Sequence, residues 1–425
     1  MITSRAWAGR RYAVLGLARS GAATVAALLV SGAEVVAWDE DAGRRDAFSH
    51  LELADPLTLD LTGFAGIVVS PGVPLNRHPI EPHADRFGVP VIGDIELFAQ
   101  ARPELPPHKV VGITGTNGKS TTTALVHHIL KTAGVPATMG GNIGLPILGQ
   151  ESLPAGGVYV LELSSFQIDL TFSLDCDIAV LLNITPDHLD RYASFEAYAA
   201  SKARLFEMQS PGRYAVVDYI AEADEDVLDN AHDPLVYFIN DVEFEQHALS
   251  PTLQGPHNLQ NARAATAVCR ALGLTGGQIA EGLRTFPGLP HRMERVRERE
   301  GVLFVNDSKA TNPDSAAPAL AAFPAVHWVV GGQAKTDDLG PCEAQLGHVR
   351  GAYCIGEAAG LFKRLLRGRV PYVEDSQTLE RAVTSAAGRA KAGETVLLSP
   401  ACASYDQFRD FEARGDAFRA LAEEL

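Results

Sequence analysis

Short apolar runs alternate with longer helix-like stretches along the whole chain, beginning near the N-terminus. Residues 12–16, 34–39 and 66–70 are apolar runs that predict strands, and residues 20–31 predict a helix between the first two. Strands that alternate with helices are typical of a parallel, doubly wound sheet. We therefore expect the first part of the chain to form an α/β domain.

The same alternation continues through the rest of the chain in two further groups. In the second group the predicted strands and helices cover residues 122–133, 158–164, 177–185, 214–218 and 258–272. In the third group the predicted strands cover residues 302–308, 326–332, 351–356 and 395–400. Because 425 residues exceed one ordinary core, we predict three α/β domains, over residues 1–93, 94–287 and 288–425.

The composition indicates a globular protein without a nucleic-acid partner. Hydrophobic residues make up 46% of the chain and charged residues 21%, and the formal net charge is −16. Such an acidic chain lacks the basic surface that nucleic-acid phosphates require. The five cysteines form no C-x-x-C pair, and no apolar run reaches the ~18 residues of a membrane span. We therefore expect a cytoplasmic protein with no zinc site and no membrane partner.

The stretch GITGTNGKST, residues 112–121, follows an apolar run and precedes a helix-like run. A strand, a glycine-rich turn and a helix in this order form a phosphate cradle, because backbone N–H groups of the turn point at the anion. Lys119 can reach the β- and γ-phosphates, and the hydroxyl of Ser120 can bind Mg²⁺. Ile113 departs from the strict pattern, which has glycine at that position. The stretch predicts a nucleoside triphosphate site.

A second glycine-rich turn, Gly16 to Gly21, follows the first predicted strand and has Ala18 in place of the middle glycine. Asp39 ends the next strand, and this combination is typical of dinucleotide-binding folds. The turn predicts a nucleotide or pyrophosphate at the helix N-terminus, with a plain strand–helix turn as the alternative. Residues 70–74 form another turn at a strand end, where open α/β sheets bind ligands.

Acidic and polar side chains accompany the predicted strands of the second group. Glu162 interrupts an apolar run, and a carboxylate there is costly unless it is paired or bound to metal. His188 lies just beyond another strand, so Glu162, His188 and Ser120 can supply ligands for one or two Mg²⁺ ions. Asn142 lies in the flexible turn GGNIG, close to a ligand if the turn folds inward. Taken alone, His188 reads as a loop or capping histidine and Lys202 as a solvated helical charge.

Three polar turns follow predicted strands of the third group, at residues 306–312, 331–338 and 399–408. The carboxyl ends of parallel strands meet at one edge of a sheet, so the three turns together predict a substrate-binding face. For each turn alone, an ordinary helix cap is the alternative. The sequence PHR, residues 290–292, marks the predicted junction with the preceding domain.

In order along the chain, these motifs resemble those of the Mur ligase family, which synthesises peptidoglycan precursors. The matching stretches are TGTNGKST, GGNIG, LELSSFQ, HLDRY, GPHNLQNA, PHRME, NDSKATN and SPACASYDQF. They span essentially the whole chain, and Ile113 is consistent with the family's own phosphate loop. Within the family, TGTNGKST, LELSSFQ, NDSKATN and LLSPACAS are most similar to the members that join D-glutamate to UDP-N-acetylmuramoyl-L-alanine.

The resemblance implies a Rossmann-like N-terminal domain for the UDP substrate, a central P-loop-type ATPase domain with a mostly parallel sheet, and a Rossmann-like C-terminal domain for the amino acid. ATP and Mg²⁺ are the implied cofactors, and we expect a monomer. The implied catalytic residues are Lys119, His188, Lys202 and Arg292. The implied metal ligands are Ser120, Glu162, His188 and Lys202, with Lys202 carried as a carbamate.

The resemblance also assigns residues to each substrate. The positions that match ATP-binding residues are Gly115, Thr116, Asn117, Gly118, Lys119, Ser120, Thr121, Asn258, Asn261, Arg292 and Asp307. Those that match residues binding the UDP substrate are Leu17, Arg19, Ser20, Asp39, Ser70, Gly72, Asn142 and His188. Those around D-glutamate are Lys309, Thr311, Lys335, Ser404 and Phe411.

Three other interpretations are open. An NAD-dependent oxidoreductase would use the turn at Gly16–Gly21 but would leave the phosphate loop unexplained. A sibling ligase that adds L-alanine, a diamino acid or a dipeptide, or a folate polyglutamate synthase, would share the ATPase core and differ in the third domain. A non-catalytic nucleotide-binding module would need no metal ligands, yet Ser120, Glu162 and His188 are all present.

Overall fold

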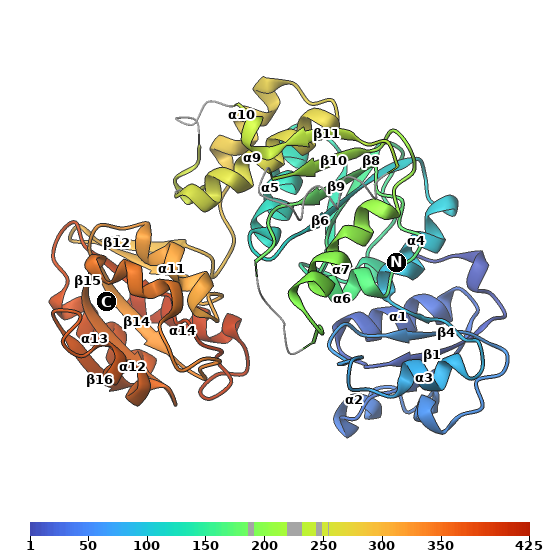
Figure 1. Ribbon diagram of the computed structural model, residues 1–425, viewed down its shortest axis with the longest axis horizontal. Coiled ribbons are helices and arrows are strands. Elements are labelled where there is room, and N and C mark those ends of the chain that lie inside the picture. Colours follow the sequence, from blue (N-terminus) through green and yellow to red (C-terminus); the bar gives the residue numbers. More distant parts are fainter. Residues whose placement is uncertain (186–190, 219–231, 244–248, 254) are drawn as a thin grey trace. The chain divides into compact units, whose positions relative to one another are not determined.

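The computed structural model describes residues 1–185, 191–218, 232–243, 249–253 and 255–425 (Figure 1). The chain divides into two compact units, residues 1–245 with 260–283, and residues 246–259 with 284–425. The first unit holds two sheets and the second unit holds a third. The predicted α/β fold with mostly parallel sheets is confirmed, and the predicted domain boundaries remain a prediction.

The first sheet is parallel and has the strand order β3-β2-β1-β4-β5. In its central strand, Tyr12 and Val14 contribute to one apolar core, whereas Ala13 and Leu15 contribute to another. Both faces of the sheet are therefore covered, as the near-continuous apolar strands predicted. Its elements are β1 (Arg11–Leu15), α1 (Arg19–Val30), β2 (Glu34–Trp38), α2 (Ala42–Asp46), β3 (Glu52–Leu53), β4 (Phe64–Val69), α3 (Ile80–Asp85), β5 (Val91–Ile92) and α4 (Asp94–Ala101).

The second sheet is parallel as well, with the order β11-β10-β9-β6-β8-β7. Its strands β8 and β9 are buried along their whole length, and β9 ends four residues before the predicted end of that strand. The elements are β6 (His108–Thr114), α5 (Lys119–Thr132), β7 (Ala137–Gly141), β8 (Gly157–Glu162), α6 (Ser165–Asp169), β9 (Ile178–Leu181), α7 (Phe195–Glu207), β10 (Tyr214–Val217), β11 (Leu235–Phe238), α9 (Pro256–Ala271) and α10 (Gly276–Thr285).

The third sheet has the order β12-β13-β17-β14-β15-β16, and β12 runs antiparallel to β13. The sequence did not indicate β12, because its residues ERVRER are mostly charged and half exposed. Glu300 and Gly301, both with positive φ, turn the chain from β12 into β13. The elements are β12 (Glu294–Arg299), β13 (Val302–Asn306), α11 (Pro313–Ala321), β14 (Val326–Gly331), β15 (Val349–Ile355), α12 (Ala359–Leu366), β16 (Val373–Gln377), α13 (Leu379–Arg389), β17 (Thr395–Leu398) and α14 (Phe411–Glu424).

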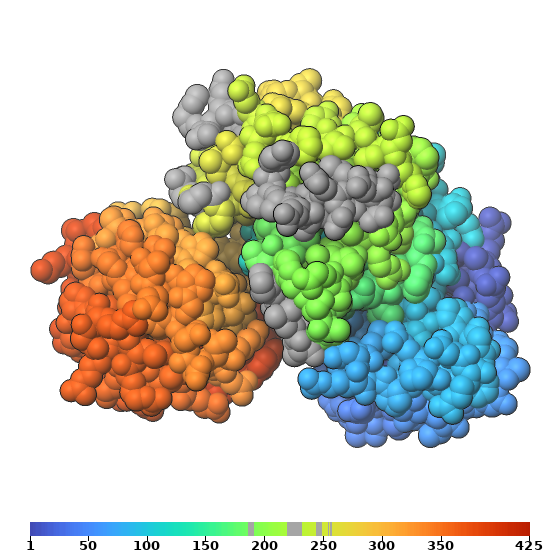
Figure 2. Space-filling view, in the orientation of Figure 1, coloured from blue at the N-terminus to red at the C-terminus, as the bar shows by residue number. Residues whose placement is uncertain are grey.

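Within the first unit, the segments of the first and second sheets pack directly against each other (Figure 2). The Gly93 N–H donates to the Leu170 carbonyl at 2.9 Å, and Glu96 Oε2 accepts from the Phe172 and Ser173 N–H groups at 2.7 and 2.9 Å. These contacts hold helix α4 between the two sheets, so residues of both can line one site.

Short 3-10 helices complete the described chain. They are η1 (Arg5–Trp7), η2 (Pro56–Thr58), η3 (Arg102–Glu104), η4 (Ile147–Gly149), η5 (Ile239–Asp241), η7 (Pro251–Leu253) and η8 (Gly340–His348). Among the helices that the structure describes, we find none with the length and apolar character needed to cross a bilayer.

Candidate functional site

The phosphate loop lies between the end of β6 at Thr114 and the start of α5 at Lys119. Gly118, the residue before α5, has a φ of 87°, and a Cβ there would lie 2.3 Å from Asn261 Oδ1. Only glycine fits this position, because other residues would meet both the left-handed strain and the clash. No described side chain caps the N-terminus of α5. The turn therefore has the form of an anion cradle.

Two lysines converge on this loop. Lys119 Nζ donates to the carbonyl oxygens of Gly115 and Thr116, at 2.9 and 2.8 Å. Lys202 Nζ donates to the same Gly115 carbonyl at 3.1 Å and lies 4.4 Å from the centre of the Tyr198 ring. Lys202 is only 1% exposed, so the interpretation of it as a solvated charge is wrong. It lies on the inward face of α7, which the sequence did not determine.

Glu162 ends β8 beside the loop, opposite Ile113 of β6. It is 2% exposed, and its Oε1 accepts from Asn142 Nδ2 at 2.9 Å. Its Oε2 has no hydrogen-bond partner among the described residues. A buried carboxylate oxygen without a partner is unfavourable unless a cation binds it. With the hydroxyl of Ser120, this oxygen belongs to the hard donor set that Mg²⁺ prefers, so the residues present fit the ion.

The structure describes only some of the other residues that were predicted to bind metal or nucleotide. His188 lies outside the described residues, and the described part of the chain contains no cluster of three His, Cys, Asp or Glu side chains. Asn258 and Asn261 are buried on helix α9 and, three positions apart, share one of its faces. Asn261 Oδ1 accepts from Thr122 Oγ1 at 3.2 Å, which ties this face to helix α5.

A cavity of about 660 Å³ opens at the carboxyl ends of β1, β2 and β4. Its size is in the range of small-molecule sites, which is ≈ 300–1,000 Å³. Of the residues predicted to bind the UDP substrate, Ser20, Asp39, Ser70 and Gly72 line it. Leu17 does not line it, because its side chain is buried in the core and its N–H donates to Asp39 Oδ2 at 2.6 Å.

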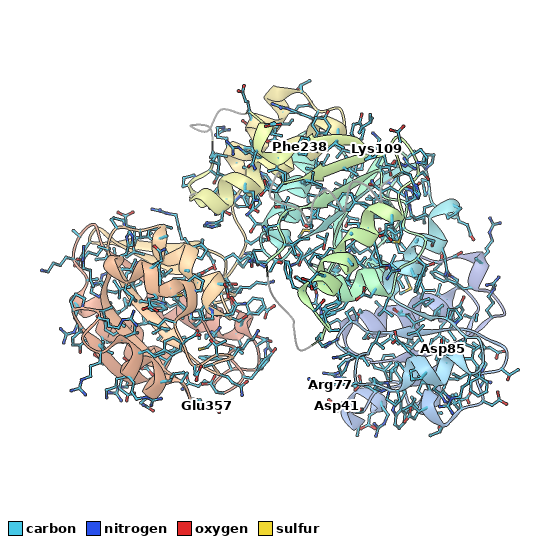
Figure 3. All side chains as sticks on the ribbon, viewed as in Figure 1. Asp41, Arg77, Asp85, Lys109, Phe238 and Glu357 are labelled. Atoms are coloured by element: carbon cyan, nitrogen blue, oxygen red, sulfur yellow. The ribbon has the colours of Figure 1, made fainter. Side chains whose placement is uncertain are left out.

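Asp39 is held as a carboxylate at the edge of this cavity. Burial opposes its ionisation, but the N–H groups of Leu17 and Asp41 and the Arg44 guanidinium outweigh burial and hold its pKa below the usual range. Asp41, labelled in Figure 3, donates its N–H to Asp39 Oδ1 at 2.9 Å. Arg45 lies 4.5 Å from the centre of the Trp38 ring. The cavity thus combines an aromatic wall with two guanidinium groups.

A smaller, polar hollow of about 230 Å³ adjoins this cavity through Ser20, Pro71 and Gly72. It reaches Asn142 and Gln167 of the segment that carries the second sheet. Arg19 Nη2 donates to the Gly144 carbonyl at 2.7 Å and so joins the two segments. A continuous series of hollows therefore leads from the first glycine-rich turn toward Glu162, the hydrogen-bond partner of Asn142.

In the second unit, Asp307 lies at the end of β13. Its Oδ2 accepts from Ser399 Oγ at 2.8 Å and its Oδ1 accepts from the Met293 N–H at 3.2 Å. Burial raises the pKa of Asp307 to about 7, although these hydrogen bonds and nearby Arg292 act in the opposite direction. The Asp307 carboxyl is therefore present in both its protonated and its ionised form near neutral pH.

The three polar turns of the third sheet meet around Arg414. Its guanidinium, 1% exposed, donates to the carbonyl oxygens of Ser308 at 2.8 Å and Cys402 at 3.1 Å. Gln333 pairs with Ala403, which adds the turn at 331–338. The three turns therefore lie together, as the sequence predicted, and the substrate role of this face stays a prediction; Lys309 Nζ lies 4.9 Å from the Phe411 ring centre. Ser404 is buried in this face, Thr311 is half-buried and Lys335 is exposed.

Comparison with known proteins identifies the family. A family model described as "Mur ligase middle domain" matches residues 113–240, and one described as "Mur ligase, glutamate ligase domain" matches residues 291–402. A UDP-N-acetylmuramoylalanine–D-glutamate ligase from Novosphingobium aromaticivorans is 60% identical over 100% of this chain and 97% of its own length. The chain belongs to the Mur ligase family. A ligase of the same description from Sphingopyxis alaskensis is 59% identical over the full length of both chains.

A Mur ligase of known structure has the same fold. The MurF ligase from Thermotoga maritima in complex with ADP matches with a TM-score of 0.62 at 17% identity, over 98% of this chain and 99% of that chain. At this identity the likeness concerns the fold alone.

The structure also reveals residues of this Mur ligase that the sequence reasoning missed. Arg44, Arg45 and His78 line the large cavity, and Arg414 links the polar turns of the second unit. Arg44 and Arg45 follow closely after Asp39, and two adjacent arginines beside a predicted ligand site are a sequence signal for these cavity residues. No local signal marked Arg414, since its partners lie about a hundred residues earlier or in another loop.

Proposed function

We propose that this Mur ligase joins D-glutamate to UDP-N-acetylmuramoyl-L-alanine at the expense of ATP, through an acyl-phosphate intermediate. The observation that carries the proposal is the 60% identity, over the whole chain, to a relative named for this reaction. The geometry supports it because a phosphate cradle with two lysines lies beside an unpartnered carboxylate oxygen. Family membership favours this ligase over an NAD-dependent oxidoreductase.

In the first step, a carboxylate oxygen of the alanyl group attacks the γ-phosphorus of ATP. The bond between that phosphorus and the β–γ bridging oxygen breaks, which yields the acyl phosphate and ADP. The main difficulty is the approach of an anion to a polyanion. Lys119 brings positive charge to the loop, and Arg292 supplies a further cation. Glycine-rich backbone N–H groups of the loop orient the phosphates.

In the second step, the amine of D-glutamate attacks the acyl carbon and phosphate leaves from the tetrahedral intermediate. The amine gives up its extra proton to a base, and His188 is the candidate that the sequence offers. The amino acid has two carboxylates, which lysine and hydroxyl donors suit. The residues that bind it are Lys309, Thr311, Lys335, Ser404 and Phe411.

The uridine diphosphate part of the substrate binds in the cavity of about 660 Å³, with Ser20, Ser70 and Gly72 at the diphosphate. Arg44 and Arg45 add positive charge there. Asn142 contacts the muramoyl-alanine part through the adjoining polar hollow, which is of a size for part of a sugar. Leu17 contributes through its main chain, since its side chain is buried.

Glu162, Ser120 and His188 would hold Mg²⁺, which supplies charge neutralisation to the phosphates when bound. Lys202 carries a carbamate in the working enzyme, and this modification converts a buried cation into an anionic oxygen ligand. Asn258 and Asn261 bind the adenine side and Asp307 the ribose. The enzyme works as a cytoplasmic monomer.

The test is phosphate release from ATP and Mg²⁺ with UDP-N-acetylmuramoyl-L-alanine, with one amino acid offered at a time. We expect release with D-glutamate only, and a product heavier by one glutamyl residue. Release with L-alanine, L-lysine or meso-diaminopimelate instead would move the chain to a sibling ligase. A lack of release with every amino acid would overturn the proposed reaction.

A further inference from the structure

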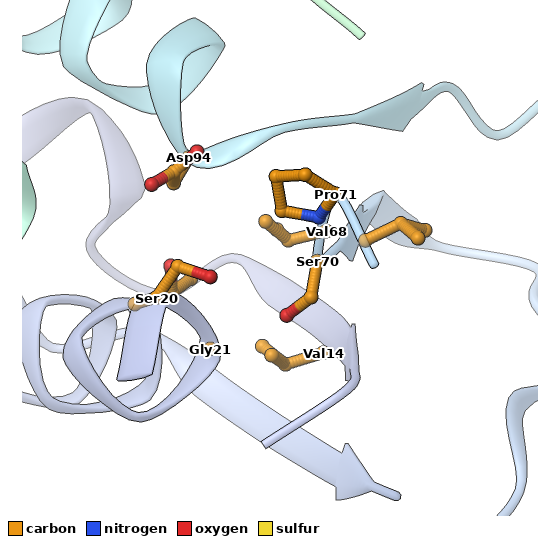
Figure 4. A pocket seen from close by; sticks show the side chains of 9 residues that line it. Val14, Ser20, Gly21, Val68, Ser70, Pro71 and Asp94 are labelled. Carbon is orange, nitrogen blue, oxygen red and sulfur yellow. The ribbon is translucent and has the colours of Figure 1, made fainter. Parts of the chain in front are cut away.

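Behind the first glycine-rich turn lies a buried carboxyl group for which the proposed reaction has no use. Asp94 is the first residue of helix α4, is 4% exposed, and neither of its oxygens has a hydrogen-bond partner among the described residues. Figure 4 shows it on the wall of a small pocket that Ser20 and Ser70 also line. The space between these side chains does not admit a water molecule. An ionised carboxylate here therefore has no side-chain or water donor among the described residues, and only the N–H groups of Ile95 and of Asp94 itself favour it.

Among the described residues that line this pocket, Asp94 alone carries a charged group. The other residues lining the pocket are uncharged: Val14, Ser20, Gly21, Thr24, Val68, Val69, Ser70 and Pro71. Burial raises the pKa of Asp94 to about 6, against a smaller lowering by the N–H groups of Ile95 and of Asp94 itself. Charged groups on the surrounding elements contact other partners: Arg11 contacts Glu52, Arg19 the Gly144 carbonyl, Glu96 the Ser173 hydroxyl, Arg102 Asp177, and Glu104 Arg5.

Ser20 connects this narrow pocket to the larger ligand site. It lies in the first turn of α1 and lines the narrow pocket, the large cavity and the adjoining polar hollow. Ser70 is already committed, because its Oγ donates to the Gly16 carbonyl at 2.8 Å. Ser20 is therefore the hydroxyl through which Asp94 can act on a ligand in the cavity.

We propose that Asp94 takes up one proton from solvent when the diphosphate of the UDP substrate binds at the Gly16–Gly21 turn, and that the protonated carboxyl positions Ser20. The O–H of Asp94 donates to Ser20 Oγ, and the O–H of Ser20 then donates to a phosphate oxygen. This inference rests on the UDP-substrate site of the proposed function. It makes Asp94 a positioning residue, with Ser20 as the group that touches the ligand.

The physical reason is electrostatic. The two negative charges of a sugar diphosphate disfavour a second anion behind the turn, so ligand binding favours the neutral carboxyl. A neutral carboxyl is a donor, whereas an ionised one only accepts. Each hydrogen bond in such a chain polarises the next, which strengthens the donation to phosphate. Binding is thereby linked to proton uptake and weakens as the pH rises.

The experiment is calorimetry of UDP-N-acetylmuramoyl-L-alanine binding at pH 7, in PIPES and in Tris, with the full chain. The different ionisation enthalpies of the buffers give the number of protons taken up. Neither the diphosphate diester nor the alanyl carboxylate of this ligand titrates near pH 7, so the uptake reports on the protein. We expect the wild type to take up more than half a proton. Asp94→Asn, whose amide donates as the protonated carboxyl does, should take up less than half of the wild-type value with a Kd within threefold.

His78 is a competing titratable group, because it lines the large cavity. A His78→Gln variant is therefore the matched control and should keep the wild-type proton uptake. Loss of the uptake in His78→Gln together with its retention in Asp94→Asn would overturn the proposal.

Two further measurements complete the test. In the wild type, Kd should rise at least threefold between pH 6.5 and pH 8, and a flat profile would overturn the proposal even if Asp94→Asn failed to fold. In a Ser20→Ala background, Asp94→Leu should weaken binding much less than it does alone; additive losses would contradict the action through Ser20. Normal binding without proton uptake would overturn this inference alone, whereas an absence of binding would overturn the proposed UDP-substrate site as well.

Discussion

Lys119 and Lys202 donate hydrogen bonds to one and the same carbonyl oxygen, that of Gly115, at 2.9 and 3.1 Å. The two lysines come from different helices, α5 and α7, and are 83 positions apart in the chain. Both side-chain amino groups therefore lie at the phosphate loop, beside Gly115. The loop backbone thus holds the cationic Lys119 beside the phosphate site, together with the Lys202 side chain that we propose to be carbamylated.

Replacement of Lys119 by alanine should lower the rate of phosphate release by about 10²–10³-fold, the typical cost of losing one preorganised group that stabilises transition-state charge. The measurement is the turnover number with saturating ATP, Mg²⁺ and both co-substrates. Lys131→Ala removes an exposed lysine from the last turn of the same helix and is the matched control. Equal rates in the two variants would contradict the role of Lys119.

Replacement of Glu162 by glutamine should raise the Mg²⁺ concentration for half-maximal activity by at least about tenfold, as changes at metal sites do. The glutamine oxygen would keep the hydrogen bond from Asn142, which leaves the NH₂ group where Oε2 now lies without a partner. Without metal, the variant should be at least as thermally stable as the wild type, because an unpartnered buried charge is gone.

The exposed Glu151 gives the control for this substitution. Glu151→Gln should leave the Mg²⁺ dependence unchanged. A metal dependence in Glu162→Gln that equals that of the wild type would show that Glu162 binds no ion.

Gly118→Ala should raise the KM for ATP by at least about tenfold. Alanine at this left-handed position also costs about 1–2 kcal/mol of backbone strain. The new methyl group would displace Asn261, whose Oδ1 would lie only 2.3 Å away. Gly134 has a similar φ of 78°, but a Cβ there meets nothing within 4 Å. Gly134→Ala therefore serves as the control for strain alone, and equal KM values for the two variants would contradict the prediction.

Asp307 should make the stability of the second unit depend on pH. Its folded pKa is raised to about 7, above the ≈ 3.9 of an unfolded chain. The folded form therefore binds a proton more tightly, and stability is lost as the pH rises from about 4 to about 7. In Asp307→Asn, the fall in Tm between pH 5 and pH 8 should be smaller by about 3 °C or more.

Asp39→Asn is the control for this measurement, because the pKa of Asp39 is shifted in the opposite direction. Asp39 is ionised at both ends of the pH 5–8 window in both states. Its replacement should leave the pH slope unchanged. If Asp307→Asn shows the wild-type slope, burial of Asp307 does not control its titration.

Much of the fold could be predicted because parallel strands that are buried on both faces have nearly continuous apolar sequences. The strands at residues 12–16 and 326–332 were found within one or two positions of β1 and β14. The antiparallel strand β12 was missed, since its charged residues at the edge of a sheet carry no such signal. Strand β9 proved shorter than its apolar run, because the chain leaves the sheet at Leu182 although Leu182 remains buried.

The sequence by itself determined the local chemistry of the phosphate loop. A strand, glycines and Lys119-Ser120 at a helix start need only neighbouring residues to form a cradle. Tertiary structure alone decided that Lys202 is buried against Gly115, that Glu162 keeps one oxygen without a partner among the described residues, and that Asp94 and Ser20 line the same narrow pocket. Lys202 and Gly115 are 87 positions apart in the chain, and Asp94 and Ser20 are 74 positions apart. Whether a charge is solvated or buried depends on which distant surfaces cover it, and local pattern does not contain that information.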